Sequence, residues 1–158
     1  MLSIFLGYCV WSMAHNLGHR LWHVHMRQGK QTDFALGESA HHQIYDNYFA
    51  FHMHNIGDPD AKFRNFPMIK VGLTLLPFVL VSFYFLTAPQ AILFTTSMYF
   101  FMAIDYAVHE KIHSEKIESG LLGILQRMHV IHHKTQRHNF CFLTGIIWDV
   151  LFGSFKLG

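Results

Sequence analysis

The sequence has few charged residues. Asp, Glu, Lys and Arg make up 14% of the 158 residues, whereas 51% are hydrophobic and 16% are aromatic. Soluble domains carry about 25% charged residues, so part of this surface is expected to contact something other than water. The net charge of only +2, with no run of Lys or Arg, argues against a nucleic-acid partner.

Cysteine and cofactor motifs are also scarce. The two cysteines, Cys9 and Cys141, lie far apart, so no disulfide framework is expected, and we interpret both as small buried hydrophobic residues. The sequence contains no G-x-G-x-x-G nucleotide fingerprint and no haem-attachment motif. Its length is that of a single domain, which we assign to residues 1–158.

Three stretches are apolar enough to contact lipid: residues 2–18, 68–86 and 91–108. A helix needs about 20 residues to cross the hydrocarbon core of a bilayer. The first stretch reaches that length only if its helix continues through His23. A cleaved signal peptide is the competing interpretation, but the stretch has no positively charged start and no small-residue cleavage site.

The second and third stretches are separated only by residues 87–90, which predicts a helical hairpin with Pro89 in its turn. Pro77 is expected to kink the second helix, which a membrane helix tolerates. Two later apolar pieces, residues 121–125 and 146–153, are too short to span. They predict interfacial or capping helices.

Charge predicts the orientation of these helices. All twelve Lys and Arg residues lie outside the hairpin turn and the extreme N-terminus. By the positive-inside rule, Met1 and residues 86–90 face outward, and residues 19–66 and 109–158 lie on the cytosolic side. The predicted fold is all-α, a multi-pass membrane protein with an N-terminal span, a helical hairpin and a cytosolic helical cap.

Histidine is the abundant polar residue, with 14 copies against 12 Lys and Arg together. Most of them fall into four short groups. The groups are His15, His19 and His23; His41 and His42 with Glu38; His109 and His113; and His129, His132 and His133. His25, His52 and His54 belong to no group and fit solvated positions, and His138 is undecided.

The grouping predicts a metal site. Helical residues four apart share one face, and two neutral imidazoles on a face can hold iron, zinc, copper or nickel. The predicted orientation leaves the side of His15 open and places the other histidines of the four groups on the cytosolic side, where they can converge. Nine or ten ligands exceed the four to six that one metal takes, so the count predicts two metals. Asp105 and Asp149 are candidates to orient ligand rings, although Asp105 also fits a role at the lipid boundary.

A shorter motif predicts a different enzyme. The run from His109 through Glu110 to His113 matches H-E-x-x-H, in which two histidines bind zinc and the glutamate acts as general base of a metalloprotease. This alternative leaves the H-x-x-H-H group and the pair His41 and His42 without a role. We therefore rank it second.

The histidine boxes resemble those of the fatty acid hydroxylase/sterol desaturase superfamily of membrane di-iron enzymes. The resemblance covers His19-Arg20-Leu21-Trp22-His23, the box from His109 to His113, and His129-Val130-Ile131-His132-His133. It continues through Asn139-Phe140 to the ending Trp148-Asp149-Val150-Leu151-Phe152-Gly153. The second box departs, because Glu38 stands where the family has histidine. Glu38 or His15 would then complete the ligand set, or the site would hold one ligand fewer.

The resemblance implies an oxidoreductase that binds two iron ions, with zinc possible after purification, and that hydroxylates or desaturates a lipid such as a fatty acyl chain, sterol or carotenoid. It also implies an electron-donor protein, namely a cytochrome, a ferredoxin or a reductase. The chain is shorter than larger members with four spans, so a homo-oligomer could complete the site. Substrate could enter along Phe94, Phe100 and Phe101, although packing or lipid contact explains most of these side chains.

A third class of function is a non-catalytic membrane subunit that keeps the histidines to bind a structural metal. It predicts tightly bound metal, no reaction with oxygen, and loss of folding when the metal is removed.

Overall fold

The computed structural model describes residues 1–30, 42, 71–114, 116–140 and 143–157. Within these residues the protein is all-α and contains no strand. Its helices are α1 (Leu2–Arg27), α4 (Leu76–Phe85), α5 (Ala88–Ser114), α6 (Gly120–Thr135) and α7 (Ile146–Leu151). The prediction of an all-α fold is confirmed for this part of the chain.

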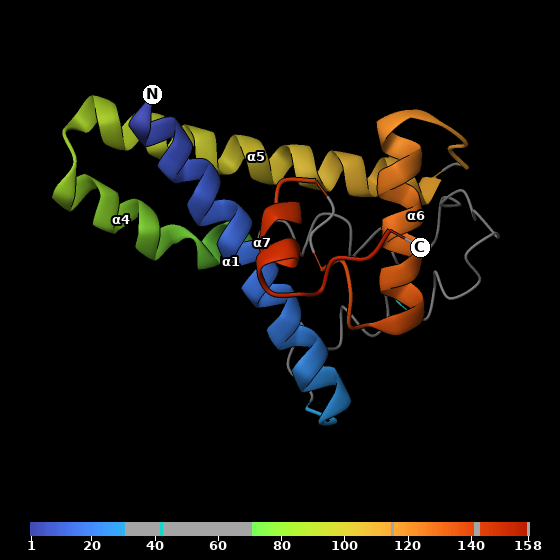
Figure 1. Ribbon diagram of the computed structural model, residues 1–158. Helices are drawn as coiled ribbons and strands as arrows, with labels where there is room; N and C mark the ends of the chain where they lie inside the picture. The colour runs from blue at the N-terminus through green and yellow to red at the C-terminus, as the bar shows by residue number, and fades with distance from the viewer. Residues whose placement is uncertain (31–41, 43–70, 115, 141–142, 158) are drawn as a thin grey trace, which may run out of the picture.

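Helix α1 continues past His23 to Arg27, as the sequence analysis required for a span. It crosses the first part of α5 (Figure 1), and Gly7 lies close to the α5 backbone. A Cβ atom at this position would collide with the Phe94 carbonyl oxygen and the Ser97 hydroxyl. A small residue is therefore required where these helices cross, as is common between membrane helices.

Helices α4 and α5 form the predicted hairpin (Figure 1). Its turn is shorter than predicted, because α5 already begins at Ala88 and Pro89 lies in its first helical turn. Proline suits this position because the first amides of a helix have no intrahelical acceptor. The Thr87 amide and hydroxyl both donate to Gln90 Oε1, at 3.1 and 2.9 Å, and this contact resembles a capping box.

The predicted kink at Pro77 is present. A turn of helix at residues 71–74 is interrupted at Leu75, and α4 begins at Leu76 with the proline in its first turn. Proline has no amide hydrogen, so the regular bond to the carbonyl four residues earlier cannot form. Residues 71–85 are therefore apolar but broken into two short pieces.

One helix in the described residues, α5, is long and apolar enough to cross a membrane, on the evidence of its length and composition. Helix α1 is as long but more polar, and residues 71–85 are apolar but short. In the described residues, the structure thus supports one candidate span rather than the three predicted from the sequence.

Two apolar cores hold the helices together. The larger joins α1, residues 71–75 and α5 through buried Trp11, Leu75 and Met98. The smaller joins the end of α5 to α6 through Ile112, Leu125 and Met128. Helix α6 stands across the end of α5 (Figure 1), and this angle turns one face of α6 toward both α1 and α5.

Three predictions about individual side chains can be compared with the cores. Phe94 is buried in the larger core and Phe101 packs against it, whereas Phe100 is exposed, so packing accounts for two of the three phenylalanines. Cys9 is a free thiol that is half-buried rather than buried. Cys141 lies outside the described residues.

Candidate metal centre

Seven histidines from three helices meet on the inner face of α6. Helix α1 supplies two, the last turns of α5 supply two, and α6 supplies three. They are His19 and His23; His109 and His113; and His129, His132 and His133. All are buried except the half-buried His109. Two compact groups of potential metal ligands result, one for each helix facing α6.

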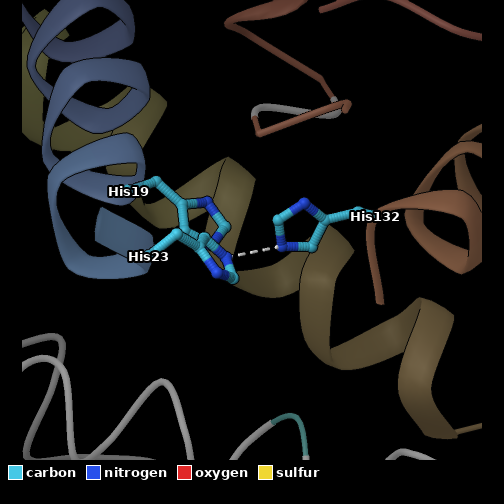
Figure 2. A group of neighbouring side chains, drawn as sticks. All are labelled: His19, His23 and His132. Atoms are coloured by element: carbon cyan, nitrogen blue, oxygen red, sulfur yellow. Dashed lines mark hydrogen bonds between the residues drawn. The ribbon is translucent and has the colours of Figure 1, made fainter. Parts of the chain in front are cut away.

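We call the group of His19, His23 and His132 site A (Figure 2). Its three ligand nitrogens lie within 4.8 Å of one another. The Nε2 atoms of His23 and His132 are 3.1 Å apart, and both rings are fully buried. Site A therefore joins α1 to α6, two helices far apart in the sequence.

In two of the site A rings, hydrogen bonds define which nitrogen has a lone pair available to a metal. His19 Nδ1 lies 2.5 Å from the Phe140 carbonyl oxygen, and His132 Nδ1 lies 2.9 Å from the His138 carbonyl oxygen. A carbonyl oxygen can only accept, so each Nδ1 carries the proton and each Nε2 keeps its lone pair. Carbonyl partners of this kind orient the histidine ligands of metal sites.

We call the second group site B. It consists of His109, His113 and His129, with ligand nitrogens within the same 4.8 Å limit, and His133 lies beside it. His129 Nε2 is 3.1 Å from that of His109, 2.8 Å from that of His113 and 3.0 Å from that of His133. The Nε2 atoms of His109 and His113 are 3.0 Å apart. The Nε2 atoms of His109, His113 and His129 thus face one another, and His133 Nε2 adjoins that of His129.

These separations match a shared metal better than hydrogen bonds among rings. Nitrogens about 2.1 Å from a metal are about 3.0 Å apart at right angles and about 3.4 Å apart in a tetrahedron. In contrast, a neutral imidazole has one N–H and one lone pair, so three mutually facing nitrogens cannot all be satisfied by protons. A bound cation stabilises all of these lone pairs at once. Both sites can therefore hold metal ions, whose identity the geometry does not specify.

The protonation states of two histidines of α6, His129 and His133, also favour metal binding. Burial lowers the pKa of His129 well below its usual value, and repulsion by protonated His133 and His113 lowers it further. The pKa of His133 is lowered by burial and by repulsion from His42 and His113. Both rings are therefore neutral at pH 7, which is the form that binds metal.

These pKa shifts predict that acid destabilises the metal-free protein. The unfolded chain has ordinary histidines with pKa near 6.5, so below that pH it binds more protons than the folded state, and stability falls as pH decreases. We expect a lower melting temperature for chelator-stripped protein at pH 5.5 than at pH 7.5, measured by circular dichroism in detergent. An equal or higher value at pH 5.5 would show that these rings are protonated in the folded state.

Two other predicted ligands lie close to the sites. The His42 ring is buried, with its centroid 4.3 Å from that of His133 and 4.9 Å from that of His23, so it lies between sites A and B. His15 stacks on His19 at 5.9 Å and is outside both groups. Glu38 and His41 lie outside the described residues, so their assignment as ligands stays a prediction.

The two predicted orienting carboxylates have different partners. Asp105 accepts from Trp11 Nε1 at 2.7 Å, from the Thr144 amide at 3.1 Å and from the Thr144 hydroxyl. It also lies 3.4 Å from His15 Nδ1. It reaches site A only through the His15 ring that stacks on His19. Its described contacts are those of a tether between α1, α5 and the segment before α7.

Asp149 contacts the loop that holds site A. It is fully buried, and its Oδ1 accepts from the Phe140 amide at 3.2 Å. The Phe140 carbonyl in turn accepts from His19. Asp149 was predicted to orient a ligand ring, whereas in the structure the backbone of Phe140 lies between the carboxylate and the His19 ring.

Sequence reasoning missed two groups of contacts at this centre. Asn16 and Arg20 both bond Asp149, and the signal for them was the i, i+4 spacing of two polar residues within α1. The ligand-orienting carbonyls of residues 138 and 140 carry no side-chain signal. His138 itself contributes its backbone, while its ring bonds Thr135.

Comparison of the chain with protein-family models, curated proteins and solved structures finds no match in any of the three. The described residues themselves show two adjacent histidine triads, buried except for the half-buried His109, in an all-α fold.

Proposed function

We propose that the protein is a membrane-bound di-iron oxygenase that hydroxylates or desaturates a lipid. The observation that carries the proposal is the convergence of six imidazoles into two adjacent groups linked through α6, with His133 beside the second group. The resemblance of the histidine boxes to the fatty acid hydroxylase/sterol desaturase superfamily supports it. Burying polar groups lowers the free energy of unfolding unless they are paired. The burial of so many imidazoles therefore supports a functional role for them.

The metal pair would supply the activation of dioxygen needed to attack an unreactive C–H bond. Hydroxylation inserts one oxygen atom into the C–H bond and reduces the other to water, consuming two electrons and two protons. Desaturation removes two hydrogens from the lipid and, with the same two electrons and two protons, reduces dioxygen to two water molecules. The imidazoles of sites A and B would hold the metals, and the surrounding burial would keep bulk water out.

We propose a multi-pass arrangement in which α1 and residues 71–85 accompany α5 through the bilayer. The outer surfaces of these helices support it, because many large apolar side chains there are exposed. Examples are Leu2, Phe5, Leu80, Phe83, Ile92 and Phe100. The N-terminus lies beside the turn between α4 and α5 (Figure 1), which agrees with the predicted common side for both. The two sites would then face the cytosol.

The presence of an apolar cavity supports the proposal that the substrate is a lipid. It lies between α1 and residues 71–75, has a volume of about 180 Å³, and is lined largely by aromatic and aliphatic groups, including Trp11, Trp22 and Leu75. Small-molecule pockets usually measure about 300–1,000 Å³, so this cavity suits a segment of a hydrocarbon chain rather than a whole ligand. His15 lines it and stacks on His19 of site A.

Exposed basic residues on the outer face of α6 support the proposal that the electron donor is an acidic protein. Arg127 and Lys134 are exposed there, Arg127 two residues before His129 and Lys134 directly after His133. Exposed Lys111 lies on the adjoining end of α5. A donor of negative surface charge would be steered to this face by electrostatic attraction, and it would dock one helix away from the metals.

The protease alternative makes an opposite prediction, because it needs only His109, Glu110 and His113. Glu110 is exposed, whereas His113 lies beside His129 of α6. We expect Glu110→Gln to keep two metals per chain and His132→Ala to lose about one, since His132 is a ligand of site A. Elemental analysis of iron-supplemented protein in detergent measures both.

The outcome that would support the protease is a single zinc per chain that persists in His132→Ala, together with a proteolytic activity that Glu110→Gln abolishes. Bound zinc alone does not discriminate, because zinc readily occupies histidine sites. A His138→Ala variant is the matched control for His132→Ala, since it alters a nearby ring while keeping the backbone carbonyl.

The non-catalytic alternative is separated by oxygen uptake. Iron-loaded protein in lipid nanodiscs, supplied with an electron donor, is expected to consume dioxygen in proportion to protein and to yield an oxidised lipid by mass spectrometry. Two tightly bound metals with no uptake in any lipid tested would favour the structural subunit.

A further inference from the structure

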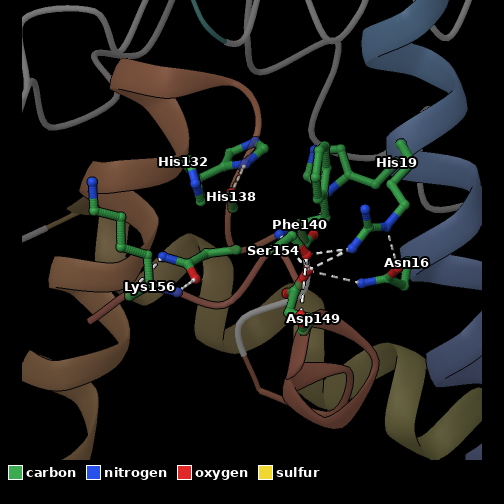
Figure 3. A network of polar contacts seen from close by, with 10 residues as sticks. Asn16, His19, His132, His138, Phe140, Asp149, Ser154 and Lys156 are labelled. Carbon is green, nitrogen blue, oxygen red and sulfur yellow. Dashed lines mark hydrogen bonds and ion pairs between the residues drawn. The ribbon is translucent and has the colours of Figure 1, made fainter. Parts of the chain in front are cut away.

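A short loop that follows α6 in the sequence bonds both of the helices that build site A. Residues 138–140 lie between α6 and α1, and the loop turns two carbonyl groups toward the site (Figure 3). The His138 carbonyl holds His132 of α6, and the Phe140 carbonyl holds His19 of α1. One loop therefore sets the orientation of two site A rings that come from different helices.

The loop is held in an unusual conformation. Asn139 has a φ of 51°, in the left-handed region that asparagine tolerates better than most residues. Its buried side chain donates to the Met128 carbonyl at 2.9 Å and to the Lys156 carbonyl at 2.8 Å, and it accepts from the Lys156 amide at 2.8 Å. These bonds fasten the loop to α6 and to the C-terminal segment.

Asp149 holds the other end of the loop. Its Oδ1 accepts from the Phe140 amide at 3.2 Å, and also from Asn16, Arg20 and Ser154 at 3.2, 3.2 and 2.6 Å (Figure 3). Arg20 also stacks over the Phe140 ring, with its Cζ 4.4 Å from the ring centroid. The carboxylate thus connects the Phe140 peptide to α1 within two turns of His19.

We propose that Asp149 is a positioning residue for site A that acts on His19 through the backbone of Phe140. The inference rests on the metal centre of the proposed function. The bond from the Phe140 amide to Asp149 and the stacking of Arg20 on the Phe140 ring hold the backbone of Phe140 in place, and they therefore hold its carbonyl group, which accepts from His19 Nδ1. His19 Nε2 is thereby kept in one orientation, as occurs when an outer partner orients a metal-binding histidine.

The proposal predicts a selective effect. The connection from Asp149 leads to His19 and, along the loop, to His132, both in site A. The contacts of Asp149 described above lead to α1, Phe140 and Ser154, whereas site B draws its ligands from the end of α5 and from α6. Replacing Asp149 should therefore weaken one of two metals, whereas a general loss of packing would weaken both.

Titration of the metal-free protein with Co²⁺ in detergent tests the proposal, because bound Co²⁺ has visible d–d absorption that needs no turnover. Asp149→Ala and the milder Asp149→Asn are compared with the wild type. His132→Ala and His113→Ala identify the site A and site B phases. The matched control is Trp148→Phe, which removes another hydrogen bond between the C-terminal segment and α1, from Trp148 Nε1 to Ser12 Oγ at 2.9 Å, and leaves the loop intact.

We expect Asp149→Ala to lower Co²⁺ affinity at site A about 10- to 100-fold, with a smaller loss in Asp149→Asn and an unchanged site B. Trp148→Phe should bind both metals as the wild type does. Equal weakening of both sites, unchanged affinity at site A, or the same loss in Trp148→Phe would each overturn the proposal. If Asp149→Ala does not fold, the Asp149→Asn titration decides. A wild type that binds no Co²⁺ would instead overturn the metal centre itself.

Discussion

Replacing His129 by alanine is expected to reduce the bound metal from about two ions per chain to about one and to abolish any oxygenase activity. His129 is the most central ligand of site B, because its Nε2 lies within 3.1 Å of those of His109, His113 and His133. The ring is also fully buried, so alanine would leave a cavity among three facing imidazoles.

The expected loss of metal affinity in His129→Ala follows from the loss of a potential ligand nitrogen. Removing it takes away one metal–nitrogen bond and leaves the remaining rings to find other positions. Substitution of only an outer partner of a metal ligand already costs about 10- to 100-fold in affinity, and loss of the ligand itself should exceed that. Since the proposed chemistry uses both metals, activity should fall to background even if site A stays filled.

Metal content by elemental analysis and Co²⁺ absorption measure the outcome. His25→Ala is the matched control, because His25 lies in the last turn of α1, outside both groups. It should retain two metals and full activity. Retention of two metals by His129→Ala would show that site B is not a metal site, and the di-metal proposal would then fail.

Removing the metals is expected to lower the melting temperature of the protein by about 10 °C or more. Ligands bound at about 1,000 times their Kd stabilise a fold by about 4 kcal/mol. A chain of this size shifts by about 2–4 °C for each kcal/mol. Site A joins α1 to α6 and site B joins α5 to α6, so metal loss would weaken the attachment of α6 to the rest of the molecule.

The fold of the hairpin should survive this treatment. The larger core of α1, residues 71–75 and α5 contains Trp11, Leu75 and Met98 and no site residue, so helix content by circular dichroism should change little at 20 °C. Addition of Fe²⁺ or Zn²⁺ should restore the melting temperature, and Mg²⁺, which prefers oxygen ligands, should not. An unchanged melting temperature after verified metal removal contradicts a structural contribution from either site.

Much of the local structure could be predicted from the sequence. The i, i+4 spacing of His19 with His23 and of His109 with His113 placed each pair on one helix face, and the structure confirms both. Pro77 correctly marked a break in its helix. The assignment of Pro89 to the hairpin turn was wrong. Proline is compatible both with a turn and with the first turn of a helix, and only the path of the folded chain distinguishes the two.

The membrane prediction shows where pattern reasoning is weakest. Apolar composition identified the stretches that can face lipid, but whether each forms a continuous span depends on helix length. Helix α5 is continuous and long enough. The proline break shortens its partner in the hairpin, and polar residues such as Asn16 and Arg20 lower the hydropathy of α1 while they bond the buried Asp149.

The sequence by itself determined the chemistry available to this protein: imidazoles in helical pairs, too few charges for a fully wetted surface, and no nucleotide or haem motif. Only the tertiary structure decided how the boxes divide. His132 faces His23 while His129 faces His109. The side-chain direction rotates by about 100° from one residue of a helix to the next, so two α6 residues that are three apart point in different directions. Because α6 stands across the end of α5, these directions lead to different partners. No spacing along the chain encodes that choice, since it depends on the packing angle between helices.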